Sequence, residues 1–195
     1  MTNSLPHQFL TPHDFLERSA LVYPEKVAVR YNDQAYTYRQ FHQRADRLAG
    51  ALQAAGIQKG DRVAYLAPNV PAMLEGHFGP MRMGAVLVTI NIRLSPGEVA
   101  YILNHSGAKA LVFDSEFAPV VRAIRDEIPG VATLVQIVDT APKAEDIPSL
   151  EYEEFLASAP EGNHRVQPDS ETDTIAINYT SVSYTHLTLP TKRTV

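Results

Sequence analysis

The sequence predicts an open, doubly wound α/β fold, in which a mostly parallel sheet carries helices on both faces. Short apolar runs recur along the chain, and most of them are nearly continuous instead of alternating with polar residues. Such runs are typical of strands that are covered on both faces, as in parallel sheets. Capped helical segments lie between the runs, and these connections are long enough for the crossovers that parallel strands require.

The first elements have clear start and stop signals. Thr11 followed by proline predicts an N-terminal helix, and residues 27–31 predict a strand. Thr37 and Gln40 form a capping box, in which the threonine accepts from an orphan amide and the glutamine side chain reaches back. The helix that follows ends at Gly56, a natural C′ residue. Its apolar stripe comprises Phe41, Ala45, Leu48, Ala49, Leu52 and Ala55.

The middle of the chain alternates strands and helices. Residues 62–66 and 85–90 predict strands, and Asn69 is expected to cap one helix that runs through Met83. Ser95 opens a further helix with a second capping box, and that helix ends at Gly107. Its inward-facing residues are expected to be Val99, Ile102 and Leu103.

Two further strands and a looser connection follow. Residues 110–113 predict a strand, and Asp114 or Ser115 is expected to cap the helix after it. Residues 133–138 predict the next strand. Residues 140–170 are richer in Pro, Glu, Asp and Ser, which indicates a looser connection with one short helix at about 150–157.

The composition argues against several classes of function. The chain has 195 residues, a net charge of −5 and no cysteine. Without excess positive charge, nucleic acid is not expected as a partner, and without cysteine there is no disulfide, thiolate nucleophile or sulfur-ligated metal. The start lacks a secretory signal, and no apolar stretch approaches the length of a transmembrane segment. We therefore expect a cytoplasmic protein, and the composition indicates no oligomeric state.

Seven short strings occur in a fixed order between about Thr11 and Ser181. Each alone is a common turn or strand pattern, but their order and spacing resemble the N-terminal part of AMP-forming acyl-CoA synthetases, a family of acyl-adenylate-forming ligases. The medium-chain and small-acid branch is the most similar. The strings are Val27-Ala28-Val29, Tyr36-Thr37-Tyr38, Ala54-Ala55-Gly56-Ile57-Gln58-Lys59-Gly60-Asp61-Arg62-Val63, Leu66-Ala67-Pro68-Asn69-Val70-Pro71, Gly84-Ala85-Val86, Asn91-Ile92-Arg93-Leu94 and Ile102-Leu103-Asn104-His105-Ser106-Gly107-Ala108-Lys109.

The resemblance implies an activity and its cofactors. Such enzymes join a carboxylic acid, here a fatty, medium-chain or small acid, to coenzyme A. The carboxylate attacks the α-phosphorus of ATP to give acyl-AMP and pyrophosphate, and the thiol of CoA then displaces AMP. ATP, Mg²⁺ and CoA are therefore the implied cofactors of the intact enzyme. The protein positions the reactants and offsets negative charge with Mg²⁺, lysine and backbone amides.

The resemblance also implies where ATP binds. In the family, a strand ends in a loop that reads Tyr-Thr-Ser-Gly-Ser/Thr-Thr-Gly-x-Pro-Lys-Gly, whose amides and lysine hold the phosphates. Here the last predicted strand, residues 174–178, leads into Tyr179, Thr180 and Ser181, which are the predicted ATP-binding residues. Position 182 is valine where the pattern has glycine. No catalytic or metal-binding residue is predicted within this chain, which we expect to be inactive by itself.

The last residues, Val182 to Val195, resemble a translated sequencing adapter. A transposase adapter contains the codons GTC TCT TAT ACA CAT CTG ACG CTG CCG ACG, which encode Val182 to Thr191 at every position. One adenine and a sample index would fill the next three codons, and the adapter resumes with GTG for Val195 and a stop codon. We therefore expect two parts: residues 1–181, an incomplete N-terminal portion of an AMP-binding domain, and residues 182–195, a non-native, disordered tail.

Simpler interpretations compete with the functional ones. Tyr179–Ser181 alone would be only a strand edge with hydroxyl groups, and its position after a buried strand favours the phosphate loop. Arg93 is expected to pair with a carboxylate, His77 to be a satisfied, partly buried histidine, and Glu151, Glu153 and Glu154 to form a solvated helix face instead of a metal site. The alternative functions are another adenylate-forming enzyme, such as an aryl acid ligase or a carrier-protein loading domain, and a stand-alone α/β binding module.

Overall fold

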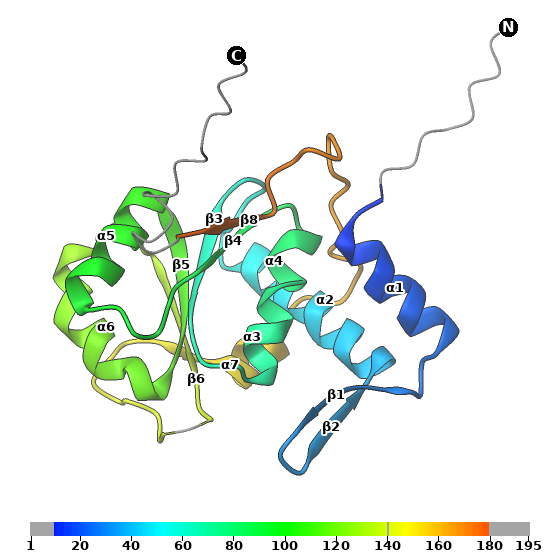
Figure 1. The fold of residues 1–195 in the computed structure, drawn as a ribbon, viewed down its shortest axis with the longest axis horizontal. Coiled ribbons are helices and arrows are strands. Elements are labelled where there is room, and N and C mark those ends of the chain that lie inside the picture. The colour runs from blue at the N-terminus through cyan, green and yellow to red at the C-terminus, as the bar shows by residue number, and fades with distance from the viewer. Residues whose placement is uncertain (1–9, 140, 180–195) are drawn as a thin grey trace, which may run out of the picture.

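The main sheet of the computed structural model, which describes residues 10–139 and 141–179, has six strands in the order β7-β6-β5-β3-β4-β8 (Figure 1). Every neighbouring pair in this sheet is parallel, as predicted. The strands are β3 (Arg62–Leu66), β4 (Val86–Thr89), β5 (Ala108–Asp114), β6 (Thr133–Ile137), β7 (Leu150–Glu151) and β8 (Ala176–Asn178).

Helices cover both faces of the sheet. The helices are α1 (Pro12–Val22), α2 (Tyr38–Ala54), α3 (Pro71–Gly76), α4 (Gly79–Arg82), α5 (Pro96–Ser106), α6 (Ala118–Ile124) and α7 (Tyr152–Ala157), with 3₁₀ turns at Ser115–Phe117 and Arg125–Glu127. Figure 1 shows α5 and α6 on one side of the sheet and α2, α3, α4 and α7 on the other. The predicted doubly wound α/β fold is confirmed.

Two apolar cores explain why the strands are nearly continuous in apolar residues. Val63 and Tyr65 of β3 belong to the core under α2 and α7, whereas Ala64 and Leu66 belong to the core under α5 and α6. Successive side chains of a strand point to opposite faces, so a strand between two helical layers needs apolar residues at every position. All four of these side chains are at most 1% exposed.

The two predicted capping boxes, at Thr37 and Ser95, are present. The hydroxyl of Thr37 accepts from the amide of Gln40 at 3.3 Å, and the Gln40 side chain accepts from the amide of Thr37 at 2.8 Å. Ser95 and Glu98 form the matching arrangement at the start of α5, which ends at Gly107 with a left-handed φ of 64°. These local signals therefore define α2 and α5 as predicted.

The segment predicted as one helix from Asn69 to Met83 is instead two short helices, α3 and α4, and that prediction was wrong. Val70, not Asn69, is the N-cap residue of α3. The helix breaks before Gly79 and Pro80, because proline has no amide hydrogen to donate to the carbonyl four residues earlier.

The first predicted strand, β1 (Val27–Tyr31), does not belong to the main sheet. It pairs antiparallel with β2 (Gln34–Thr37) in a separate hairpin, whose turn places Asn32 at a φ of 50°. β2 and the two-residue strand β7 were not predicted. Among the described residues, no helix combines the length and apolar character needed to cross a membrane.

Candidate functional site

The predicted site lies at the carboxyl edge of the sheet, where β3, β4 and β8 end together. Tyr65 of β3 is paired with Thr89 of β4, and Thr89 is paired with Asn178 of β8. The chain leaves β3 towards α3 on one face of the sheet and leaves β4 towards α5 on the other (Figure 1). Connections that diverge in this way leave a crevice at the carboxyl edge, where open α/β proteins bind ligands.

Tyr179, the first of the three predicted ATP-binding residues, directly follows β8 at this edge. Its partly buried ring packs against the core under α5 and α6. Its hydroxyl lies 2.7 Å from Nδ1 of His105, near the end of α5. Burial raises the pKa of the Tyr179 phenol, so this group remains a neutral O–H donor near neutral pH.

A side-chain hydrogen bond from β4 also contacts the end of β8. The hydroxyl of Thr89 donates to Oδ1 of Asn178 at 2.6 Å. Thr180 and Ser181, the other two predicted ATP-binding residues, lie outside the described residues, so their phosphate contacts stay a prediction. The same applies to the expected tail at residues 182–195.

The described residues contain Tyr179, the first of the predicted ATP-binding residues, but no metal site. No group of three His, Asp or Glu side chains among them could hold a metal ion. The resemblance implies a loop of glycines and a lysine that binds the phosphates. Residues 182–195 do not follow this pattern.

The other polar residues considered in the sequence form no metal site among the described residues. Arg93 is exposed and makes no ion pair with the described residues, so its predicted carboxylate partner is not found there. His77 is exposed and not partly buried as predicted, and its Nδ1 lies 2.9 Å from the carbonyl of Met73. Glu151 caps α7 by accepting from the amide of Glu154 at 2.9 Å, and Glu153 binds Arg44 at 2.6 Å.

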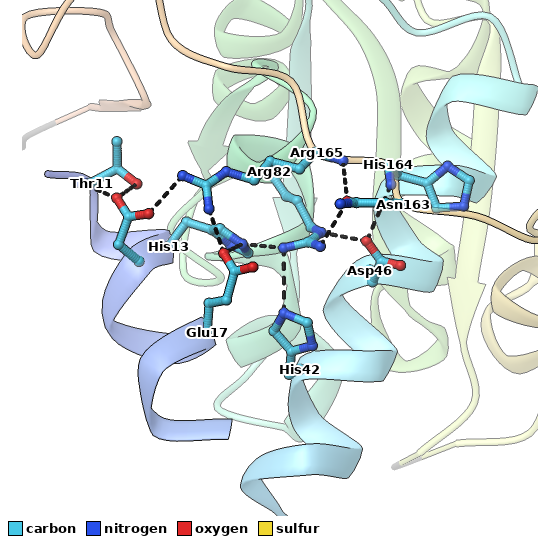
Figure 2. Close-up of polar contacts among 10 residues, drawn as sticks. Thr11, His13, Glu17, His42, Asp46, Arg82, Asn163, His164 and Arg165 are labelled. Carbon is cyan, nitrogen blue, oxygen red and sulfur yellow. Dashed lines mark hydrogen bonds and ion pairs between the residues drawn. The ribbon is translucent and has the colours of Figure 1, made fainter. Parts of the chain in front are cut away.

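A buried polar cluster that the sequence did not indicate lies near the opposite, amino edge of the sheet (Figure 2). Arg82 of α4, which is 3% exposed, is its centre. Its guanidinium contacts His13 of α1 and Asp46 of α2, and Nη2 donates to Oδ1 of Asn163 at 3.0 Å. Arg165 binds Asp14 at 2.6 Å and also pairs with Glu17. These partners lie far apart in sequence, so no local pattern predicts the cluster.

The electrostatics of this cluster favour a structural role. Each arginine is paired with a carboxylate, so the charges are balanced. Burial, and then the positive charges of Arg82 and Arg165, lower the pKa of His13 from 6.5 to about 4. Burial and Arg82 also lower the pKa of His42, whose Nε2 lies 3.4 Å from Nη1 of Arg82. The cluster joins α1, α2, α4 and the segment around Asn163.

A second buried carboxylate is held below α2. Glu75 of α3 is fully buried, and it accepts from Nε of Arg44 at 2.5 Å and from the hydroxyl of Tyr152 at 2.8 Å. Burial raises the pKa of Glu75, while the hydrogen bonds and charge of Arg44 oppose this shift. The group ties α2, α3 and α7 together and faces the core, not the carboxyl edge.

Comparisons with known proteins agree on one family. A model of the family described as AMP-binding enzyme matches residues 16–183. The chain is 37% identical over 185 residues to the peroxisomal acetate/butyrate–CoA ligase AAE7 of Arabidopsis thaliana, covering 88% of this chain and 32% of that protein. It is 45% identical over 147 residues to a long-chain-fatty-acid–CoA ligase of Thermus thermophilus, covering 73% of this chain and 26% of that protein.

A solved structure shows the same fold. The crystal structure of the anthranilate–CoA ligase AuaEII in complex with anthranoyl-AMP superposes with a TM-score of 0.82 and 29% identity. The match covers 91% of this chain and 33% of that one. The chain thus spans about a third of the length of AAE7 and about a quarter of the length of the Thermus enzyme, 32% and 26%.

Proposed function

Because the chain belongs to the AMP-binding enzyme family, we propose that it is part of an ATP-dependent acid–CoA ligase. In this proposal the whole protein activates a carboxylic acid as acyl-AMP and then transfers the acyl group to CoA. The observation that carries the proposal is the parallel pairing of β8 with β4, which places Tyr179 at the carboxyl edge of the sheet. That edge is where this class of sheet binds nucleotides.

The proposed substrate is a monocarboxylic acid of the fatty, medium-chain or small class. The names of the relatives support a carboxylic acid in general, since they range from acetate and butyrate to long-chain fatty acids. The name of the structural match supports aryl acids such as anthranilate as the alternative. A panel of acids that differ in chain length and aromaticity separates these two classes.

The tail is part of the proposal. Residues 182–195 correspond to a translated adapter and not to the gene, and the native frame continues with Gly-Thr-Thr-Gly after Ser181. This chain alone then forms no acyl-AMP, because residues 182–195 contain no glycine for the close approach of amides to phosphates.

The test begins with the gene and ends with the enzyme. Sequencing the locus from genomic DNA without adapters is expected to give a glycine codon directly after that of Ser181. The complete protein is then incubated with ATP, Mg²⁺, CoA and each acid, and AMP and the acyl-CoA thioester are measured together. The proposal is wrong if genomic DNA encodes Val182 to Val195, or if the complete protein releases no AMP with any acid. Nucleotide binding by the 195-residue chain itself would favour a stand-alone module.

A further inference from the structure

We infer that His105 is a positioning residue of the proposed ligase, which holds Tyr179 and thereby the start of the ATP phosphate loop. This inference rests on the proposed function and adds a residue to the same site. His105 lies on α5, and Tyr179 follows β8. The hydrogen bond between them is therefore a tertiary contact that joins two elements 74 residues apart in the sequence.

Tertiary hydrogen bonds fix the end of α5, which carries His105. The guanidinium of Arg62 donates from Nε to the carbonyl of Ser106 at 2.6 Å and from Nη2 to the carbonyl of Gly107 at 2.8 Å. These bonds satisfy carbonyl groups that a helix terminus otherwise leaves without partners. Nδ2 of Asn104 donates to the carbonyl of Glu127 at 2.8 Å, which ties the last turn to the segment after α6.

The exposed imidazole of His105 lies between two tyrosine rings. It stacks on the ring of Tyr101, one helical turn earlier, with centroids 5.3 Å apart and planes at 20°. The ring of Tyr179 meets the imidazole edge-on, with centroids 5.8 Å apart and planes at 81°. The hydroxyl of Tyr179 and Nδ1 of His105 form a hydrogen bond in which either group donates, depending on the tautomer of the imidazole.

Strand pairing alone fixes the end of β8 weakly. β8 pairs with β4 over only three residues, from Ala176 to Asn178, and it is the last strand of the described sheet. Ala176 and Asn178 are exposed. Tyr179 is the residue directly before Thr180 and Ser181, so its side chain fixes the chain where the predicted loop begins. A displacement of about 1 Å at a reacting group can cost about 100-fold in rate, which is why such a fixed point matters.

Three variants of the complete enzyme test the inference. His105→Phe keeps the stacked ring but removes its hydrogen-bonding nitrogen, and Tyr179→Phe removes the hydroxyl. His105→Asn places a polar amide atom near the position of Nδ1 and keeps a hydrogen-bonding group. One hydrogen bond of this kind corresponds to roughly 3- to 10-fold. We expect His105→Phe and Tyr179→Phe each to lower kcat/KM for ATP by this factor, and His105→Asn to restore most of it.

The readout separates positioning from a general loss of structure. The KM values for the acid and for CoA are expected to stay within two-fold, because only the phosphate loop is displaced. The double variant His105→Phe with Tyr179→Phe is expected to be no worse than either single variant, since both remove the same bond. His77→Phe, at an exposed histidine of the other helical layer, is the matched control and is expected to leave all constants unchanged.

The possible failures are distinguishable. If the complete wild-type enzyme forms no acyl-AMP, the proposed function is wrong, and the role of His105 in it is wrong as well. If the wild-type enzyme is active but His105→Phe and Tyr179→Phe keep the wild-type kcat/KM for ATP, only the positioning role is overturned. Losses that add in the double variant would also overturn it, because the two side chains would then act independently.

Discussion

Lowering the pH from 7 to 5 is expected to destabilise the folded chain through His13. The imidazole is 3% exposed and lies against Arg82 in the cluster of Figure 2. Burial, then Arg82 and Arg165, lower its pKa from 6.5 to about 4 in the folded state. The unfolded chain therefore binds more protons than the folded chain between these two values, so stability is lost as the pH falls through this window.

The size of the effect follows from the shift. A difference from 6.5 to about 4 corresponds to about 3 kcal/mol of unfolding free energy once the pH is below both values. About 2 kcal/mol of this is lost between pH 7 and pH 5. For a chain of this length, 2 kcal/mol lowers the unfolding midpoint by about 4–8 °C. His42, whose pKa is lowered by burial and Arg82, adds to the loss in the same direction.

Thermal or urea unfolding of the chain at several pH values between 7.5 and 5 measures this loss. His13→Gln keeps a side chain that can accept from Arg82 but cannot titrate, so its stability should vary less with pH, by about 2 kcal/mol over the window. His77→Gln, at an exposed histidine, should keep the wild-type pH dependence. If His13→Gln and the wild type lose stability equally as the pH falls, His13 is not a buried neutral group in the folded chain, and the predicted contribution of its lowered pKa is refuted.

Three further substitutions test the packing. Gly76→Ala is expected to destabilise the chain by about 1–3 kcal/mol, because its Cβ would lie 2.6 Å from the ring of Tyr65, which is fully buried. Urea unfolding measures this loss, and Gly97→Ala, where a Cβ meets open space, is the neutral control. Thr37→Ala removes the N-cap of α2 and is expected to cost about 1 kcal/mol, which Thr37→Ser should largely avoid; equal losses in the two variants would contradict the cap. Glu75→Ala removes the buried carboxylate that Arg44 and the hydroxyl of Tyr152 share, while Arg44 keeps its ion pair with Glu153. Because a buried hydroxyl then lacks an acceptor, the variant is expected to cost about 1–3 kcal/mol, with Glu75→Gln intermediate; a neutral Glu75→Ala in the same assay would show that these contacts are not essential.

Local signals in the sequence predicted the elements that local interactions define. Thr37 and Gln40 are three residues apart, and their reciprocal bonds appear where the capping box placed them. The hairpin was missed because the apolar run of β1 has the same composition as the core strands, while its partner β2 is more polar. The break before Pro80 was missed because a continuous helix was assumed across a residue that cannot donate to the helix.

The site was predictable only in part, for the same reason. The end of the last strand at Tyr179 follows from the strand pattern and the resemblance together. His105 stands inside one of the strings that carry the resemblance, yet nothing local marks it, since its partner lies 74 residues further on. The partners of Arg82 lie 36 to 81 residues away, at Asp46, His42, His13 and Asn163. Contacts of this range depend on the tertiary fold.

The two edges of the sheet differ in a way that suits the proposed activity. At the amino edge, the charges of Arg82 and Arg165 are balanced by carboxylates from other elements, so that edge is fixed by its own contacts. At the carboxyl edge, Asn178 and Arg93 are exposed, and a strand of three residues leads into the predicted loop. A loop that must admit and release a nucleotide cannot be held by its ligand alone, because it has to keep its place between turnovers. The contact of Tyr179 with His105 supplies such a hold from the protein side, at the first of the three predicted ATP-binding residues.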